Sequence, residues 1–482
     1  MAPPPALPTV DIFILTFNAA KNSINVASFA NHLYNAFHNN ATTLPELVVV
    51  SLQEMAPLAK AFIGDSVLKP YFQRYESAVN LAAAKFLTGE GRTPPKDGIY
   101  RLATARNVSM TGIMLLARDK YALRNIRTTE LGFGAGDMAN KGAVGLRFLY
   151  SKEDESGQSR QTELTFVSTH LQAYEWKLET RNKNWESIVS GLVFENPRRY
   201  ISGRASQSED GDEGQRLLEQ DGTQKALHDI SIYKPGSHLF VTGDLNYRLS
   251  ITAPETGAIF PSVDPDSPDH YSRFFIRDQL TAERAAGRTL HGLSEAEIKF
   301  PPTYKLKVLP KKRPGTETDL LRAEGGEDDA EEEAEWKWVV YRWPGWCDRV
   351  LYLDIPWWAK EATSSKNLEM KVAAYDALPA VRTSDHRAVY LRVNVPVIES
   401  ADLAPSPAAI ETELARSGNG HMVDPRVRLP FPIAPGSWDH RAFVKQCQRV
   451  IGWSMLISQS KPVIAVFATL LIMGLGTWWL KG

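Results

Sequence analysis

The chain has 482 residues, a formal net charge of −1 and two cysteines, Cys347 and Cys447. The balanced charge excludes a chain-wide positive field that would attract nucleic acid, and two cysteines exclude a disulfide framework. The N-terminal MAPPPALPTV has no basic segment followed by an apolar core, so we predict no signal peptide and a body in the reducing cytosol.

Strands and helices alternate along most of the chain. Short apolar runs predict buried strands at 10–16, 47–52, 111–117, 143–149, 164–169, 239–241, 349–353 and 389–395. Apolar residues at helical spacing predict helices at 24–37, 56–84 (broken near Pro70), 175–193 and 215–232. This alternation predicts an α/β sandwich of two packed sheets flanked by helices.

Six of the predicted strands carry a polar residue at one end. These residues are Asn18, Glu54, His170, Asp244 with Asn246, Asp348, and His386 with Asp385. Ligand sites in sheet-based folds are commonly built at such strand ends. Asp244 and Asn246 are two positions apart, so in an extended chain they share one side and can grip a water, an oxyanion or a cation. A turn that closes the strand is the alternative explanation of this pair.

Three stretches are predicted to lie outside the packed body. Residues 202–214 are acidic and rich in Ser and Gly, and residues 310–335 open with Lys311-Lys312-Arg313 and end in an acidic run. Blocks of like charge repel one another, so both read as disordered, solvated insertions. Residues 397–440 are rich in Pro, Ser and Gly and are predicted to be a flexible linker, long enough to let the body reach an apposed membrane.

The segment 463–480 contains 18 residues and no charge. A membrane helix needs about 20 apolar residues, so we predict a transmembrane tail anchor, with a buried core helix as the alternative. Its rise of about 27 Å matches the hydrocarbon core of the endoplasmic reticulum, about 27 Å, so we expect that membrane, with the catalytic body in the cytosol. Residues 441–461 are predicted to form an amphipathic helix along the membrane surface.

Four sequence blocks carry a family resemblance. GDLNYR (243–248), PPTYK (301–305), PGWCDRVLY (344–352) and SDHRAVY (384–390) resemble the signature blocks of the inositol polyphosphate 5-phosphatases, within the endonuclease/exonuclease/phosphatase superfamily. The resemblance covers 8–396 and implies a four-layer α/β sandwich of two mixed sheets. With the tail anchor, the layout resembles fungal phosphatidylinositol 4,5-bisphosphate 5-phosphatases of the endoplasmic reticulum. It implies Mg²⁺-dependent removal of the 5-phosphate, which gives phosphatidylinositol 4-phosphate.

The resemblance also implies catalytic roles. Asp244 would orient or deprotonate the attacking water. Asp348 would hold His386 in one tautomer and favour its charged form, which stabilises negative charge on the phosphate. His170 would contact phosphate. The remaining implied residues are Asn18 and Asn246 as ligands of metal or scissile phosphate, Glu54 as the main Mg²⁺ ligand, and Asp385 as a support of the metal shell.

A further implied set binds the phosphoinositide head group. It comprises Asn18, Asn140, Lys141, Tyr304, Lys305 and Arg342. Tyr304 and Lys305 match the contacts of the family to the 4-phosphate. Arg342 matches the Arg of the family's Lys-x-Arg, but Val340 stands where the Lys would be.

Three other functions are compatible with parts of the pattern. The same pocket would accept soluble inositol polyphosphates. A nuclease of the superfamily is disfavoured by the PPTYK and WCDR blocks and by the lack of a basic surface, so no nucleic-acid partner is expected. A catalytically silent lipid-binding or tethering protein is disfavoured because Glu54, Asp244 and His386 are all present.

Overall fold

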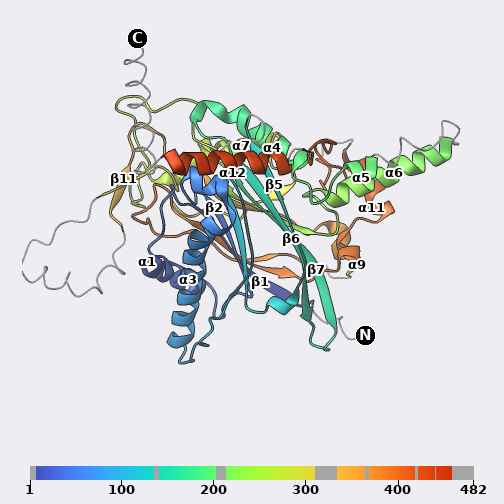
Figure 1. The fold of residues 1–482 in the computed structure, drawn as a ribbon, viewed down its shortest axis with the longest axis horizontal. Helices are drawn as coiled ribbons and strands as arrows, with labels where there is room; N and C mark the ends of the chain where they lie inside the picture. The colour runs from blue at the N-terminus through green and yellow to red at the C-terminus, as the bar shows by residue number, and fades with distance from the viewer. Residues whose placement is uncertain are drawn as a thin grey trace, which may run out of the picture.

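The computed structural model describes residues 7–134, 140–201, 213–309, 334–363, 368–417, 422–439 and 441–458 (Figure 1). Two six-stranded sheets form the body. The first has the order β13-β14-β1-β2-β4-β3. Its strands are β1 (Thr9–Asn18), β2 (Leu47–Gln53), β3 (Arg101–Val108), β4 (Thr111–Ala117), β13 (Lys371–Ala377) and β14 (Val389–Pro396).

The second sheet has the order β5-β6-β7-β8-β12-β9. Its strands are β5 (Leu123–Phe133), β6 (Lys141–Glu153), β7 (Ser159–His170), β8 (His238–Asp244), β9 (Leu293–Ser294) and β12 (Asp348–Leu353). Each sheet is mixed, because β1 runs parallel to β2 and β7 parallel to β8 while the other neighbours are antiparallel. A separate two-stranded ladder joins β10 (Leu306–Val308) to β11 (Trp336–Trp338).

Helices cover the outer face of each sheet. Between the sheets lies an apolar layer that includes Ile12, Val49 and Phe166. On the outer face of the first sheet, α1 (Val26–His38) and α3 (Asp65–Gly89) pack on side chains such as Phe13. On the second, α4 (Leu178–Gly191) and α7 (Gln279–Ala285) pack on side chains such as Val167. The predicted sandwich of two mixed sheets flanked by helices is therefore confirmed.

The remaining helices are short or peripheral. They are α2 (Leu58–Ile63), α5 (Arg198–Ile201), α6 (Glu213–Ile230), α9 (Trp357–Ala362), α10 (Ser400–Leu403), α11 (Pro407–Ser417), α12 (Arg441–Ser458) and the 3-10 turns Lys120–Ala122, Glu175–Lys177 and Tyr271–Arg277. The break expected near Pro70 lies instead at Gly64, between α2 and α3. Gly64 has a φ of 69°, which glycine adopts without strain.

The structure differs from the expected flexible linker at 397–440. Its described residues include α10 and α11, and Ile398, Leu403 and Ile433 are buried. Arg426 is also buried and donates a 2.7 Å hydrogen bond to the carbonyl of Asp354. Apolar residues spaced through a Pro-rich segment are enough to fix it on a body that offers matching surface, and composition alone does not reveal this.

Several predicted features lie wholly or mostly outside the described residues. These are the insertions at 202–214 and 310–335 and the apolar segment 463–480. Among the described residues, no helix has the length and apolar character needed to cross a bilayer. The helix α12 occupies most of the range 441–461.

Gly243 sets the close approach of β7 and β8. Its φ is 154°, and a Cβ there would lie 1.8 Å from the Thr169 carbonyl oxygen. We therefore expect Gly243→Ala to lower the free energy of unfolding by about 3 kcal/mol or more, since backbone cannot yield as a side chain does. Urea unfolding measures this. Gly222→Ala, in α6 with open space around it, is the matched control and should not lower the free energy of unfolding, since alanine is favoured over glycine inside a helix. Equal losses in both variants would contradict this account.

Candidate active site

The polar strand ends predicted from the sequence meet at one end of the sandwich. Strands β7 and β8 are parallel, and His170 is paired in register with Asp244. Strand β12 is antiparallel to β8, and its first residue, Asp348, also pairs with Asp244. In the facing sheet, β1 ends at Asn18 beside the end of β2. The fold therefore brings together residues that are far apart in sequence. Ser384 and Asn18, for example, are 366 positions apart, and the Ser384 hydroxyl donates a hydrogen bond to the Asn18 carbonyl.

Asp244 is the centre of this cluster. Its Oδ2 accepts hydrogen bonds from Asn18 Nδ2 at 3.0 Å and from His170 Nε2 at 3.1 Å, and its Oδ1 accepts from the backbone N–H of Asn246 at 3.1 Å. Burial alone would raise the pKa of Asp244, but His170, His386 and Lys141 together hold it well below its usual range. The carboxylate is therefore ionised and acts as an acceptor.

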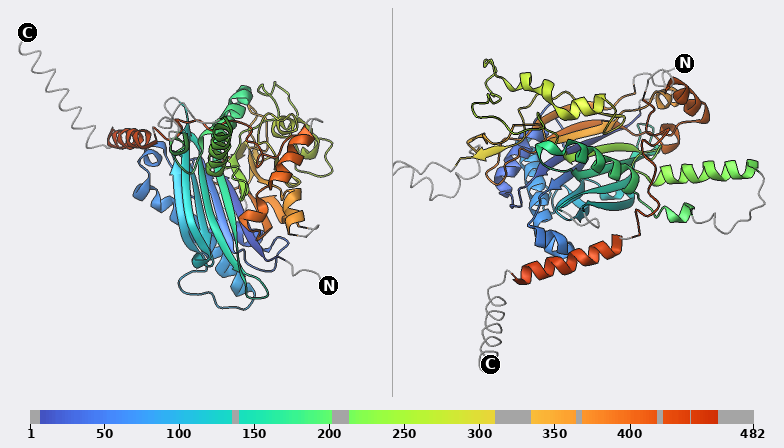
Figure 2. Two further views of the ribbon diagram at one scale, coloured as in Figure 1. Left: turned by 90° about the vertical axis from the view of Figure 1, so that its right-hand side faces the viewer. Right: turned by 90° about the horizontal axis from the view of Figure 1, so that it is seen from above.

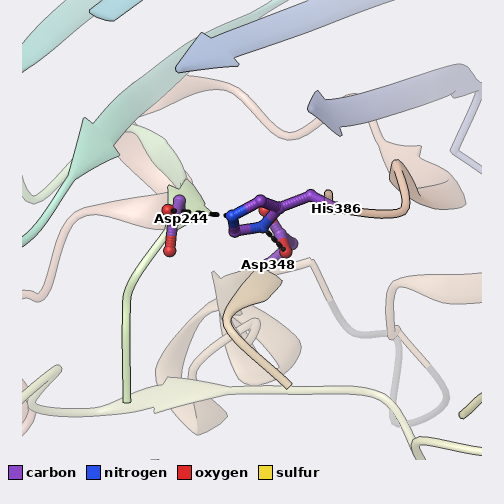
Figure 3. Close-up of side chains that lie close together, drawn as sticks. All are labelled: Asp244, Asp348 and His386. Atoms are coloured by element: carbon purple, nitrogen blue, oxygen red, sulfur yellow. Dashed lines mark hydrogen bonds and ion pairs between the residues drawn. The ribbon is translucent and has the colours of Figure 1, made fainter. Parts of the chain in front are cut away.

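His386 and Asp348 form a buried pair (Figure 3). His386 Nδ1 lies 2.8 Å from Asp348 Oδ2, which also accepts a 2.7 Å hydrogen bond from Thr303 Oγ1. The other imidazole nitrogen, Nε2, points toward Asp244 and lies 4.0 Å from its Oδ2 (Figure 3). The imidazole is therefore oriented by Asp348 and placed between two carboxylates.

The surrounding carboxylates keep His386 charged. Burial alone would lower its pKa, but the carboxylates of Asp348, Asp244 and Asp385 outweigh burial and raise it to about 9. Asp244, Asp348 and His386 offer ligand atoms that all lie within 4.8 Å of one another, a grouping that resembles a metal site. A protonated imidazole has no lone pair to give a metal, so this trio is better suited to holding a proton and an oxyanion.

His170 and Lys141 form the next layer. Both are buried, and the Lys141 ammonium contacts the imidazole of His170. Burial, with the adjacent Lys141 as a second cause, lowers the pKa of His170, so this histidine is neutral and donates through Nε2 to Asp244. Burial also lowers the pKa of Lys141 to about 8. The two histidines thus differ in charge because their neighbours differ.

Arg248 is a site residue for which the sequence analysis assigned no role. It is buried, bonds to the Asn246 side-chain oxygen, and its guanidinium lies 4.2 Å above the Tyr304 ring. That ring is in turn 4.6 Å from the His386 ring. The Tyr304 ring, tilted by 40° from the imidazole, therefore packs against it and limits its movement. Arg248 ends the GDLNYR block, and its position there was the signal that could have identified it.

Glu54 lies at the rim. It follows β2 directly, its carboxylate pairs with Lys21 at 3.3 Å, and its side chain is 21% exposed. Its charge partly offsets the lowering of the pKa values of Lys141 and His170 by burial, as expected for a carboxylate near the cluster. A partly exposed carboxylate that keeps room for water fits Mg²⁺, which binds few protein ligands. The amide oxygen of Asn18, at the end of β1, accepts from the Ala20 N–H at 3.0 Å and is a neutral oxygen donor at the same end of the sandwich.

The family assignment rests on the match of a whole domain. The model of endonuclease/exonuclease/phosphatase family 2 matches residues 15–392. The chain belongs to the endonuclease/exonuclease/phosphatase family. Inositol-1,4,5-trisphosphate 5-phosphatase 1 of Schizosaccharomyces pombe is 25% identical over 395 residues, which are 81% of this chain and 27% of that protein. Type II inositol polyphosphate 5-phosphatase 14 of Arabidopsis thaliana is 28% identical over 401 residues, 80% and 30% of the two chains.

The chain thus spans less than a third of the length of these two relatives. A solved structure shows the same fold. The inositol polyphosphate 5-phosphatase domain of SPsynaptojanin, in complex with inositol (1,4)-bisphosphate and calcium ion, superposes with a TM-score of 0.50 and 21% identity, covering 86% of this chain and 93% of that one. The blocks that suggested this branch of the endonuclease/exonuclease/phosphatase family lie in the matched region.

The outer candidates are arranged differently from the central ones. Lys305 bonds to Asp385, the carboxylate expected to support the metal shell. The order of residues could not reveal this pairing, since it depends on the packing of β10 against the SDHR loop. Arg342 Nη1 pairs with Glu175 at 2.9 Å, Val340 is 74% exposed, and Asn140 is exposed just before β6.

The raised pKa of His386 predicts that the catalytic rate of this protein declines at alkaline pH. If the imidazolium is the working form, kcat/KM should fall as pH rises through about 9, because the proton is held below that pH and lost above it. A pH-rate profile with a soluble inositol phosphate measures it. Asp348→Asn should move the decline to lower pH, since it removes a carboxylate that raises the pKa. Lys141→Arg is the control: if it abolishes the decline, Lys141 and not His386 is the titrating group.

Proposed function

We propose that the chain hydrolyses the 5-phosphate of phosphatidylinositol 4,5-bisphosphate to give phosphatidylinositol 4-phosphate, with a divalent cation. One observation carries the proposal: an ionised Asp244 lies between a neutral His170 and a charged His386 that is oriented by Asp348. A base and a cation only 4.0 Å apart suit the attack of water on a phosphate. Membership of the family and the 5-phosphatase names of its relatives support the same reaction.

The residues divide the work in a phosphoryl transfer. Positioning and electrostatic stabilisation supply most of the catalysis in such reactions. Asp244 would orient the attacking water and accept its proton. His386 would donate Nε2–H to a phosphate oxygen as charge develops there, while Asp348, itself held by the Thr303 hydroxyl, keeps Nδ1 in place. His170 would hold the Asp244 carboxylate in its orientation through the contact of Nε2 with Oδ2.

Mg²⁺ is the proposed cation, with Glu54 and the amide oxygen of Asn18 as its protein ligands. When bound, it would polarise the phosphoryl oxygen and relieve its charge. Lys305 and Arg342 are the proposed contacts of the 4-phosphate. In the structure Lys305 pairs with Asp385 and Arg342 pairs with Glu175. The 4-phosphate would therefore have to compete with these carboxylates for the two cations. A substrate with one phosphate fewer would compete less well, and this favours polyphosphorylated head groups.

Glu54→Gln is expected to raise the Mg²⁺ concentration required for half-maximal activity by at least about tenfold, the scale of perturbing a metal site. A neutral amide is a poorer ligand for a hard cation than a carboxylate. Calorimetric titration of Mg²⁺ gives a readout independent of turnover. Glu297→Gln, an exposed carboxylate paired with Lys299, is the matched control and should change neither value. Turnover that persists in EDTA would remove the cation from the proposal.

The membrane placement is also a proposal. The uncharged segment 463–480 supports a tail anchor in the endoplasmic reticulum, with the catalytic body in the cytosol. Such an anchor favours lipid over soluble inositol phosphates, because it confines enzyme and substrate to one surface. The test is phosphate release from a panel of lipid and soluble inositol phosphates, with and without Mg²⁺. Release only from soluble substrates would overturn the lipid assignment, and release from none of them would overturn the activity.

A further inference from the structure

The helix α12 lies along the outside of the body, against α2 and the end of β5 (Figure 2). Its Gly452 is buried, and a Cβ there would lie 2.7 Å from the Ala59 carbonyl oxygen of α2. Only glycine permits this approach of two helix backbones without a shift. The contact therefore holds α12 in one position on the catalytic body.

All charged side chains of α12 bond to the body. The helix carries three, Arg441, Lys445 and Arg449. Arg441 donates to the Gly191 carbonyl at 2.7 Å and to Thr129, Lys445 pairs with Glu130 at 3.4 Å, and Arg449 pairs with Asp65. Because these residues and Gly452 recur at intervals of three or four, they occupy one side of the helix. The packed side of α12 is its charged side.

The opposite side carries no charge and exposes several large apolar residues. Phe443, Val450 and Trp453 are 66%, 62% and 51% exposed. Their spacing of seven and three residues puts them on one stripe of the helix.

The packed side is mixed: Val444, Met455 and Leu456 are half-buried there, while Lys445 and Arg449 keep 43% and 47% of their side chains exposed. The helix therefore leaves a second set of large apolar residues in solvent. Exposed apolar stripes of this kind mark interaction sites.

The sequence that follows α12 indicates what covers the stripe. Only residues 459–462 separate the end of α12 from the uncharged segment 463–480. Five chain steps reach at most about 18 Å. If that segment enters a bilayer, the C-terminal end of α12 is held within about 18 Å of the point of entry. An aromatic and aliphatic stripe without charges suits insertion at the headgroup boundary, where Trp and Phe are favoured.

The elements under α12 lead into the active site. Glu130 lies three residues before the end of β5, where Phe133 pairs with Lys141 of β6. On the other side, α2 begins four residues after Glu54. A membrane in contact with α12 is therefore next to the catalytic end of the sandwich. The described part of 397–439 is itself packed on the body, so it gives the body little freedom to swing away.

We propose that α12 is a membrane-docking platform that holds the catalytic end against the bilayer in which the chain is anchored. The enzyme then hydrolyses lipid of its own membrane and not of an apposed one. This statement about substrate source rests on the proposed function, whereas the docking of the helix does not. It replaces the expected picture of a body that reaches across a long linker.

The kinetic test uses the full chain reconstituted in phosphatidylcholine vesicles. Phosphatidylinositol 4,5-bisphosphate is supplied either in the same vesicles or in separate ones. Same-vesicle turnover should exceed separate-vesicle turnover by about 10²-fold, the effect of confinement. The triple variant Phe443→Ser, Val450→Ser, Trp453→Ser should reduce same-vesicle turnover about tenfold or more and leave turnover of soluble inositol 1,4,5-trisphosphate unchanged. Equal turnover in the two arrangements would overturn the proposal.

Two variants separate docking from general damage. The triple variant Tyr121→Ser, Ile259→Ser, Ile276→Ser changes exposed apolar residues away from α12 and should leave both activities intact. Lys445→Glu with Arg449→Glu should release the helix from the body and lower same-vesicle turnover. Adding Glu130→Lys and Asp65→Lys should restore it by reversing both ion pairs. Failure of this charge reversal to rescue would refute the clamped platform.

A readout without turnover separates failure of docking from failure of the proposed function. An environment-sensitive fluorophore is attached at Val450→Cys in a Cys447→Ser background of the full chain. Its emission should shift to the blue in phosphatidylcholine vesicles, whereas the same label at Ile276→Cys should not shift. Absence of the shift would refute docking even if the enzyme is active. If the molecular mass in solution doubles as the protein concentration rises, and the triple variant of α12 stays monomeric, the stripe binds a second copy of the chain instead.

Discussion

His386→Ala is expected to lower kcat by about 10²-fold or more, the scale of losing one donor to the transition state. The imidazolium is the charged donor that the site holds in place, between Asp348 and Asp244. Initial rates with saturating soluble inositol 1,4,5-trisphosphate measure the loss. His228→Ala, a histidine that bonds to the Pro425 carbonyl outside the site, is the matched control and should retain the wild-type rate.

The pairing of His386 with Asp348 leads to a further expectation for the variants of both residues. Asp348→Asn should also lower kcat, because it disturbs the tautomer and the charge of His386. The two losses should not add in the double variant, since the residues act as a unit. Fully additive losses, or a wild-type rate in either single variant, would contradict the pairing.

Asp244→Asn is expected to have the larger effect, toward the upper end of about 10²–10⁴-fold in kcat. The change removes the proposed base. It also sets an amide against the Asn18 amide and the His170 N–H, both of which now donate to the Asp244 carboxylate. KM should change much less than kcat, because the lost interactions act on the attacking water and not on the head group.

The control for Asp244→Asn is Asp376→Asn, a partly buried carboxylate on β13 that accepts from the Ala377 N–H. It should leave kcat unchanged. Thermal unfolding of both variants shows whether the fold is kept. A kcat within a few-fold of wild type for a folded Asp244→Asn protein would exclude this residue as the base.

Local pattern was sufficient for the layers of the fold. The run 47–52, LVVVSL, is apolar on both faces, which is the signature of a strand covered on both sides. The stretches 24–37 and 175–193 show helical spacing, and α1 and α4 form there. These features depend on neighbours within a few residues, so the sequence carries them directly. The motif blocks likewise identified Asp244, Asp348 and His386 before their geometry was known.

Long-range pairing was beyond the reach of the sequence. The charge of His386 depends on three carboxylates that lie within reach only after β8, β12 and the SDHR loop have packed. The pairing of Asp385 with Lys305, the stacking of Arg248 on Tyr304 and the packing of 397–439 on the body are of the same kind. For α12 the sequence showed an amphipathic helix, but either face could have met the body. The structure places the charged face inward because Glu130, Asp65 and Gly452 make the contacts there, and this leaves the apolar stripe outside.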